Sequence, residues 1–446
     1  MRHSDITSTN RPQHRMAVLF LWVALTLAIG CRALLPSEGP MTPTIKPTPS
    51  PSPILTPSPT PMRSPRDQGV TLTVWLPDFT SPVAPGLAGE IVTAQLNAFA
   101  VQHPTVDLEY LVKKPYGVGG IQDFLLTAQA VVPEALPDLV AVDWREIFPL
   151  AQKGLLQPLD NLISADLLDD LYPFALEAGK IGEYLVALPY ECDLTFLAYN
   201  ATQMPRPPQT WTNVISHAAT YLFPAGPGDG AVTEALLIQY FAITDTLTSA
   251  NGALTPDPST LTEVFQYYHN LVALGIAPAS VLEMVSADDC WPVYEAGKAA
   301  LTHVRASRIA ADRDVPQNTE YAPIPTRAGN TATVAWGWGW AIVTQDPERQ
   351  KIAAAFIEHM MHPENLSRWC AAAYYLPTRR SSLLQTVADT DYAVFLQRLL
   401  EVAYPAPIHP EYPTLSHALQ IVLHDVLTGK AAPEEATAMV LKALER

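Results

Sequence analysis

The sequence predicts an α/β fold built on a parallel sheet. From Val70 onward, short stretches with strand-like alternation are followed by stretches with helical apolar spacing, and this order repeats along the chain. Hydrophobic residues make up 48% of the 446 residues, which is enough for a large core and more than one domain. Strands that alternate with helices are typical of parallel strands joined by right-handed crossovers.

The expected elements follow one another in order. Strands are expected where apolar and β-branched residues dominate short runs, at 70–76, 106–112, 138–143, 195–200, 299–304 and 339–343. Helices are expected where apolar residues recur every three or four positions, at 89–104, 122–132, 216–223, 260–275, 348–361, 391–404, 415–429 and 433–446. The last helix is expected to begin at Pro433, which is followed by an acidic first turn.

The N-terminal segment has the layout of a secretory signal peptide. An apolar run at 16–31 is too short to span a membrane comfortably, follows three arginines and ends in Cys31. We therefore expect residues 1–30 to be a signal peptide and Cys31 to carry a lipid that anchors the protein to the outer face of the cytoplasmic membrane. Lipoprotein signals usually have Leu three residues before the cysteine, where this chain has Ala28. Without the lipid, the protein is expected to be secreted or periplasmic.

A linker is expected at 31–69, directly after the signal peptide. Residues 36–65 include eleven prolines and ten serines or threonines, a composition that favours extended polyproline II and buries nothing. At roughly 3.1 Å per residue such a segment reaches ~90 Å. We expect it to tether a folded domain to its anchor, the alternative being an incidental disordered terminus.

Charge and cysteine content exclude several classes of function. The formal net charge is −17 without Lys or Arg clusters, which argues against a nucleic-acid partner and gives no support for docking on anionic lipid. No pair of the four cysteines has metal-ligand spacing, so we expect no metal site. Cys192, Cys290 and Cys370 are expected to be mostly buried free thiols, although the spacing leaves one disulfide open.

Six segments resemble, in the correct order, a known family. They are the extracellular solute-binding proteins of bacterial ABC importers, in the sugar-binding group that includes maltose-binding protein. The first five segments are VTLTVWL with HPTVDLEY, LPDLVAVDWREIFPLAQKGLLQPLDNLI, GKIGEYLVALPYECDLTFLAYN, QTWTNVISHAAT and EAGKAALTHV. The sixth is the long segment AWGWGWAIVTQDPERQKIAAAFIEHMMHPENLSRWCAAAYYLPTRRSSL. Each alone is weak, whereas six in order across 70–385 make a specific match.

The resemblance implies two α/β lobes of the type II periplasmic-binding-protein fold, joined by a hinge, with the ligand in the cleft between them. The expected boundaries are 70–190 with 303–345 for lobe 1, and 191–302 with 346–446 for lobe 2. It also implies a monomer without cofactor that captures a carbohydrate, expected to be an oligosaccharide, and delivers it to ABC permease subunits. Many relatives carry Gly and Trp after the strand at 299–304, where this chain has Arg305 to Arg308. The ligand is therefore expected to differ from the sugars of the best-known relatives.

Alternating tryptophans supply the first candidate binding residues. Trp336, Trp338 and Trp340 alternate with Gly337 and Gly339, so on a strand the indoles share one face and the glycines leave the other face open to a neighbouring backbone. Aromatic faces cover the apolar C–H patches of sugars, and we expect Trp338 and Trp336 in the site. The alternative is that the tryptophans pack under a helix.

Polar candidates lie at the expected lobe crossing and at a strand end. Tyr190 and Glu191 sit at the crossing, where a carboxylate accepts two hydroxyl hydrogen bonds, or instead caps or salt-bridges the hinge. Asp143 and Trp144 end the strand at 138–143, beyond which open α/β sheets bind ligands.

Further candidates have ordinary packing as an equal alternative. Phe79, Tyr116, Arg305 and Tyr375 are retained as ligand-binding residues. The weaker candidates are Trp75, Asp78, Trp291, His303 and Tyr374.

Catalysis has little support in the sequence. GxSxG, HExxH and P-loop motifs are absent. The chain has so many acidic residues that some pair of carboxylates could always be assigned to a glycosidase, so such a pair is not informative. We expect no catalytic residues. The alternatives left open are an extracytoplasmic polysaccharide-degrading enzyme and a binding protein that reports to a sensor instead of a permease.

Overall fold

The computed structural model describes residues 69–228, 231–249 and 252–445. The expected signal peptide, Cys31 and the proline-rich linker lie outside these residues. Across the described residues, the helices are too short or too polar to cross a membrane.

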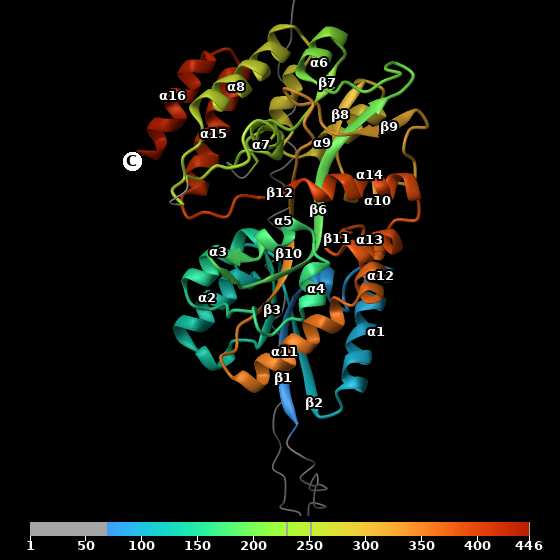
Figure 1. Ribbon diagram of the computed structural model, residues 1–446, viewed down its shortest axis with the longest axis vertical. Helices are drawn as coiled ribbons and strands as arrows, with labels where there is room; N and C mark the ends of the chain where they lie inside the picture. The colour runs from blue at the N-terminus through green and yellow to red at the C-terminus, as the bar shows by residue number, and fades with distance from the viewer. Residues whose placement is uncertain (1–68, 229–230, 250–251, 446) are drawn as a thin grey trace, which may run out of the picture. The chain divides into compact units, whose positions relative to one another are not determined.

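A ten-stranded mixed sheet runs through the described part of the chain (Figure 1). Its strand order is β2-β1-β3-β10-β6-β8-β7, and β9, β11 and β12 pair at its sides. Along that order the strands are β2 (Val106–Lys113), β1 (Val70–Pro77), β3 (Leu139–Asp143), β10 (Thr333–Ile342), β6 (Leu188–Asn200), β8 (Leu301–Arg305) and β7 (Tyr221–Leu222). The flanking strands are β9 (Thr319–Ala322), β11 (Leu376–Pro377) and β12 (Ala403–Pro405), and a separate ribbon consists of β4 (Lys180–Ile181) and β5 (Tyr184–Leu185).

Strand pairing, helix packing and two buried hydrophobic clusters group these elements into two lobes, although the first cluster also includes Trp291, Tyr294 and Val304 of the second lobe. Lobe 1 contains β1 to β3, the first half of β6 and the second half of β10. Its helices are α1 (Leu87–Gln102), α2 (Ile121–Val131), α3 (Trp144–Gln152), α4 (Ala165–Asp169), α5 (Pro173–Ala178), α11 (Pro347–Met360), α12 (Pro363–Ala373), α13 (Arg380–Thr386) and α14 (Thr390–Glu401).

Lobe 2 contains the second half of β6, the start of β10, and β7 to β9. Its helices are α6 (Trp211–His217), α7 (Glu234–Phe241), α8 (Pro258–Ala273), α9 (Ala287–Glu295), α15 (Tyr412–Leu427) and α16 (Pro433–Leu444). The short α10 (Ala306–Ala311) follows β8 and packs on β6.

Two long strands carry the chain between the lobes. The first half of β6 pairs with β10 and its second half with β8 and β9, so one strand serves both lobes. The β10 strand crosses beside it, and β12 pairs with the start of β10 at Thr333–Ala335. Three adjacent backbone segments therefore form the connection between the lobes.

The structure corrects the expectation of a parallel sheet. β1 pairs in parallel with β2 and β3, as helical crossovers require, but β10 runs antiparallel to both β3 and β6. The antiparallel pairs arise because β6 leaves lobe 1 and β10 returns to it.

The expected lobe boundaries also need correction. Residues 346–401 were assigned to lobe 2, but α11 packs on β1 and α12 on α1 in lobe 1. Residues 303–334 were assigned to lobe 1, but β8 and β9 pair with the lobe 2 half of β6. The helix expected at 216–223 is instead α6 followed by β7, because the capping box at Thr210 starts the helix earlier. The helix expected to begin at Pro433 is confirmed as α16.

Candidate ligand-binding site

Strand register places the candidate residues side by side where β3, β10 and β6 meet. Trp338 pairs with Asp143 of β3 on one side and Glu191 of β6 on the other, and Trp336 pairs with Asp193. Side chains directly opposite each other in antiparallel strands lie on one face, ~5 Å apart at Cβ. The pairing therefore sets two indoles among three carboxylates on one face of the sheet.

Gly337 permits this close pairing on the opposite face. A Cβ atom on Gly337 would lie 2.1 Å from the backbone oxygen of Glu191 and 2.9 Å from the Trp144 ring. Gly339 is less crowded, with the Leu188 backbone at 3.3 Å. The expectation that these glycines admit a neighbouring backbone is confirmed.

A cavity of about 510 Å³ opens over this face and is lined by both lobes. This volume falls within the ~300–1,000 Å³ of small-molecule sites. The lining includes seven of the expected residues, namely Tyr116, Asp143, Glu191, Arg305, Trp336, Trp338 and Tyr375. Their contact with a ligand stays a prediction.

The lobe 1 wall is an aromatic group held by one carboxylate. Phe79 and Tyr116 contact Trp338, with ring centroids at 5.2 and 5.6 Å. The Tyr116 hydroxyl donates to Asp143 at 2.8 Å, and Arg145 donates to both carboxylate oxygens at 2.8–2.9 Å. Asp143 also caps α3 by accepting the Arg145 backbone N–H, so the cap fixes the position of its carboxylate.

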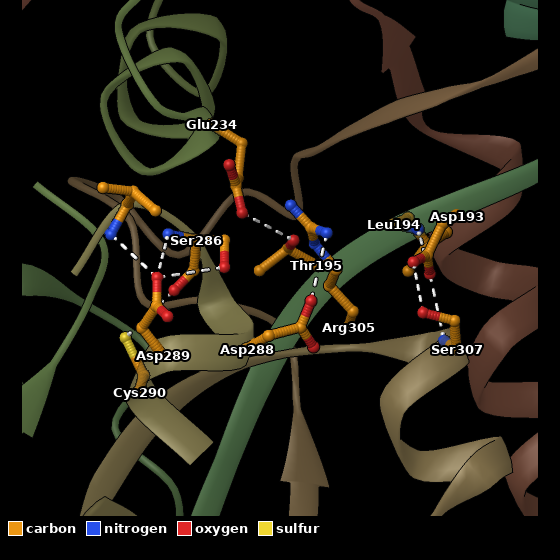
Figure 2. A network of polar contacts seen from close by, with 11 residues as sticks. Asp193, Leu194, Thr195, Glu234, Ser286, Asp288, Asp289, Cys290, Arg305 and Ser307 are labelled. Atoms are coloured by element: carbon orange, nitrogen blue, oxygen red, sulfur yellow. Dashed lines mark hydrogen bonds and ion pairs between the residues drawn. The ribbon is translucent and has the colours of Figure 1, made fainter. Parts of the chain in front are cut away.

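The lobe 2 wall is charged and centres on Arg305 (Figure 2). The guanidinium pairs with Asp288 at 3.2 Å and lies 4.7 Å from the centroid of the Trp336 ring. Although burial opposes it, the charges of Glu234, Asp193 and Asp288 raise the pKa of Arg305 above its ordinary value. Glu234, at the start of α7, accepts a hydrogen bond from Thr195 at 3.2 Å.

Asp193 is anchored at the lobe crossing. Its carboxylate accepts hydrogen bonds from the Ser307 hydroxyl and backbone and from the Leu194 backbone, as Figure 2 shows. Burial raises the pKa of Asp193, and the Arg305 charge and these hydrogen bonds oppose the rise.

Glu191 differs from its neighbours because one oxygen is left without a partner. Its side chain is buried, and Oε2 accepts no hydrogen bond from the described residues. Burial, followed by the charges of Asp193 and Asp143, raises the pKa of Glu191 well above its ordinary value, although a backbone hydrogen bond from Trp338 opposes the rise. A buried carboxyl of this kind is available to a ligand's hydrogen-bond donor.

Three expected residues are not among those that line the cavity. Tyr190 is left unpaired by a β-bulge opposite Trp338 and Gly339, and it stacks on Trp340 at 4.9 Å. Trp144 is fully buried beside Phe174 at the start of α3. Phe79 supports Trp338 and Tyr375 from the side.

Trp340 and the weaker candidates do not line the cavity either. Trp340 packs under α11 against Phe356, as the helix-packing alternative expected for the tryptophans. Trp75 packs against Phe124, and Asp78 accepts a hydrogen bond from the backbone of its own loop. Trp291 is hydrogen-bonded to Asp312, and His303 to Tyr221. Tyr374 is exposed at the end of α12.

Several residues that line the cavity were not predicted from the sequence. Asp193 and Arg145 lie next to predicted residues, and their positions on the expected crossing and helix start were signals that went unused. Glu234, Asp288, Ser307 and Tyr412 come from separate elements, and no motif links them. Only the fold brings these four residues together.

The described cysteines form no disulfide. Cys192, Cys290 and Cys370 are free and buried, as expected. Within the described residues, His, Cys, Asp and Glu side chains form no cluster suited to a metal ion.

The fold and the cavity define the class: a two-lobed binding protein with its solute cavity between the lobes. A family profile described as bacterial extracellular solute-binding protein matches residues 97–395. The match covers more than half of the chain, so the protein belongs to this family, whose members act outside the cytoplasm.

Solved structures of individual proteins have a similar fold. The cyclic alpha-maltosyl-1,6-maltose binding protein of Arthrobacter globiformis is 19% identical, with a TM-score of 0.69 over 84% of this chain and 98% of that chain. The sugar-binding protein MalE of Xanthomonas citri is 19% identical, with a TM-score of 0.67 over 84% and 97%. These similarities show a shared fold.

A curated relative matches over a short segment. The maltotriose-binding protein of Pyrococcus abyssi is 38% identical over 77 residues, which is 17% of this chain and 17% of the length of that relative.

Proposed function

We propose that the protein is the solute receptor of an ABC importer and captures a carbohydrate in the cavity between its lobes. The observation that carries the proposal is a cavity wall in which Trp336 and Trp338 lie among carboxylates and guanidinium groups. Indole faces cover the apolar faces of sugar rings, and planar charged groups satisfy several hydroxyls at once. The relatives named above bind maltose-type sugars or maltotriose by their descriptions, which supports the same class of ligand here.

A second cavity favours an oligosaccharide over a monosaccharide. It has a volume of about 470 Å³ and shares Arg145, Ala231, Pro407, Tyr412 and Ser416 with the first cavity. The two spaces are therefore neighbours that share part of their walls. A chain of sugar units that fills both meets the aromatic wall at one end and a proline-rich wall at the other.

Hinge closure supplies the mechanism. A ligand that contacts lobe 1 through Trp338 and lobe 2 through Arg305 makes both sets of contacts only when the lobes are close, so it shifts the population toward the closed form. The three adjacent backbone segments at the crossing absorb the motion. The closed form is then the one that the permease subunits recognise, and a monomer suffices for this cycle.

A thermal-shift screen with malto-, cello-, xylo- and manno-oligosaccharides tests the proposal. A ligand at one hundred times its Kd adds ~2.7 kcal/mol to the free energy of unfolding, and the expected outcome is a rise in Tm that grows with chain length. A response to polyamines or phosphate compounds, with none to any sugar, contradicts the carbohydrate assignment. A receptor is expected to leave every sugar intact, which chromatography after overnight incubation measures. Shorter sugar products would contradict the receptor and indicate an enzyme.

Anchoring through Cys31 is part of the same proposal. The N-terminal sequence supports it, because an apolar run ends at this cysteine and a proline-rich linker follows. Wild-type protein is expected in the membrane fraction of a host that processes lipoproteins, and a Cys31→Ser variant in the soluble extracytoplasmic fraction. Equal membrane retention of both contradicts the lipid anchor and leaves the receptor function untouched.

A further inference from the structure

Five carboxylates and two guanidinium groups line the first cavity, which leaves an excess of negative charge. Arg145 pairs with Asp143 in lobe 1, and Arg305 pairs with Asp288 in lobe 2. The Arg305 charge also acts on Asp193 and Glu234. Each of these four carboxylates therefore lies within the influence of a guanidinium group, although two cations cannot neutralise all four.

Glu191 is the exception among these carboxylates. Its Oε2 is buried without a hydrogen-bond partner among the described residues, and no guanidinium figures among the influences on its pKa. Its electrostatic neighbours, Asp143 and Asp193, are themselves acidic. The centre of the cavity therefore presents a carboxyl group that protein cations leave uncompensated.

Glu191 lacks both a hydrogen-bond donor and a compensating positive charge, and a neutral hydroxyl group of a ligand supplies only the first. It donates a hydrogen bond to Oε2 but adds no positive charge among three neighbouring carboxyl groups. An ammonium group donates the same bond and also compensates the charge, and a buried carboxylate needs both. The indole of Trp338 beside Glu191 adds a cation–π surface for the same group.

We propose that the ligand carries a protonated amine on one sugar unit, and that this amino sugar unit binds Glu191 between Asp143 and Asp193. The inference rests on the proposed carbohydrate function and deepens it. The net charge of −17 favours the approach of such a cation at long range.

Isothermal titration with matched ligands tests the inference. The probes are glucosamine oligomers of two to four units, the acetylated oligomers of the same linkage, and the corresponding glucose oligomers. We expect the free-amine series to bind at least tenfold more tightly than the acetylated series at pH 6.5. Burial and the neighbouring carboxylates raise the pKa of Glu191, whereas a bound ammonium group lowers it, so binding of the ammonium form is expected to favour loss of a proton, measured in buffers of different ionisation enthalpy.

A Glu191→Gln variant separates the charge of this side chain from its shape. It is expected to lose the tenfold preference for the amine, read for each protein as the ratio of its affinities for the free-amine and the neutral oligomers. Glu183→Gln, an exposed carboxylate in the turn between β4 and β5, is the matched control and is expected to keep the preference. Unchanged Tm values confirm that each variant folds.

The outcomes distinguish this inference from the proposed function. Equal or tighter binding of neutral oligomers overturns the amine and leaves the carbohydrate receptor standing. Preference for the amine that survives Glu191→Gln overturns the placement at this residue. No binding of any oligomer by a folded protein overturns both.

Discussion

The two walls of the cavity are built on different physical principles. The lobe 1 wall is an aromatic cluster in which Trp338 is 4% exposed and contacts Phe79 and Tyr116. In lobe 2, Arg305 lies over the half-buried Trp336 and is held by Asp288. The lobe 1 wall is therefore continuous with a hydrophobic core, whereas the lobe 2 wall depends on charge compensation. Changes at the first should affect stability and binding together, and changes at the second mainly binding.

Replacing the two tryptophans tests this comparison most strongly. Trp338→Ala removes a buried indole, and we expect it to lower the free energy of unfolding by ~3–4 kcal/mol. Trp336→Ala is expected to cost about 1 kcal/mol because its indole is only half-buried, while both variants lose at least tenfold in ligand affinity. Urea unfolding and titration with the ligand found in the screen measure both effects. Equal loss of stability in the two variants would show that the walls do not differ in this way.

A methyl group at the crossing tests how tightly the strands are joined between the walls. Gly337→Ala places a Cβ against the Glu191 backbone, and we expect it to cost ~3 kcal/mol or to prevent folding. Gly339→Ala, with its nearest contact at 3.3 Å, is the matched control and is expected to cost about 1 kcal/mol. Thermal unfolding of both variants gives the difference, and a tolerant Gly337 would contradict the close pairing of β6 and β10.

The stability of the protein at acid pH tests the lobe 2 side. His303, on β8 two residues before Arg305, is buried, and burial lowers its pKa from 6.5 to about 3. Below pH 6.5 the His303 imidazole binds a proton in the unfolded chain but not in the folded protein. The free energy of unfolding therefore falls as the pH falls from 6.5 toward 3. Between pH 7 and 4.5 we expect a His303→Gln variant to lose ~2–3 kcal/mol less than wild type.

Urea unfolding at the two pH values measures the effect of His303. His217→Gln changes an exposed histidine on α6 and is the control, expected to behave as wild type. Parallel pH profiles for wild type and His303→Gln would refute a buried neutral imidazole.

Alkaline pH tests the lobe 1 side. Burial and the charge of Asp143 raise the pKa of Glu146 from 4.5 to about 8, against the charge of Arg145. The protonated carboxyl is favoured in the folded state, so its contribution is full below pH 4.5 and is lost as the pH rises through 8. Glu146→Gln is therefore expected to be more stable than wild type at pH 8.5 by on the order of 4 kcal/mol, and equal at pH 4. A scanning calorimetry series in which the two proteins stay equal throughout would contradict the prediction.

The sequence predicts the aromatic wall better than the charged one. Trp336 and Trp338 were found because strand alternation orders side chains locally, and Glu191 and Asp143 because they lie at a predicted crossing and strand end. Tyr190 was misplaced because a bulge shifts the β6 register by one residue, and no local pattern shows the bulge. Glu234 and Asp288 were missed because the folding of α7 and α9 around Arg305 brings them there, and that arrangement depends on contacts between distant segments.

The lobe boundaries were misassigned for a related reason. Apolar spacing predicts that 348–361 is a helix, and α11 confirms it. Spacing does not tell which core the helix covers. That choice is made by Phe356, which packs against Trp340 and Phe99 of lobe 1.

The position of Trp336 and Trp338 on either side of Gly337 gives the protein an intrinsic optical reporter. One indole faces a guanidinium in lobe 2 and the other an aromatic cluster in lobe 1, and both line the cavity. A bound solute displaces water from the half-buried Trp336 ring and changes the surroundings of the buried Trp338 ring, so tryptophan emission should shift in wavelength without any attached dye. The receptor therefore carries its own fluorescent readout of occupancy, and the Trp336→Ala and Trp338→Ala variants assign the signal to each lobe.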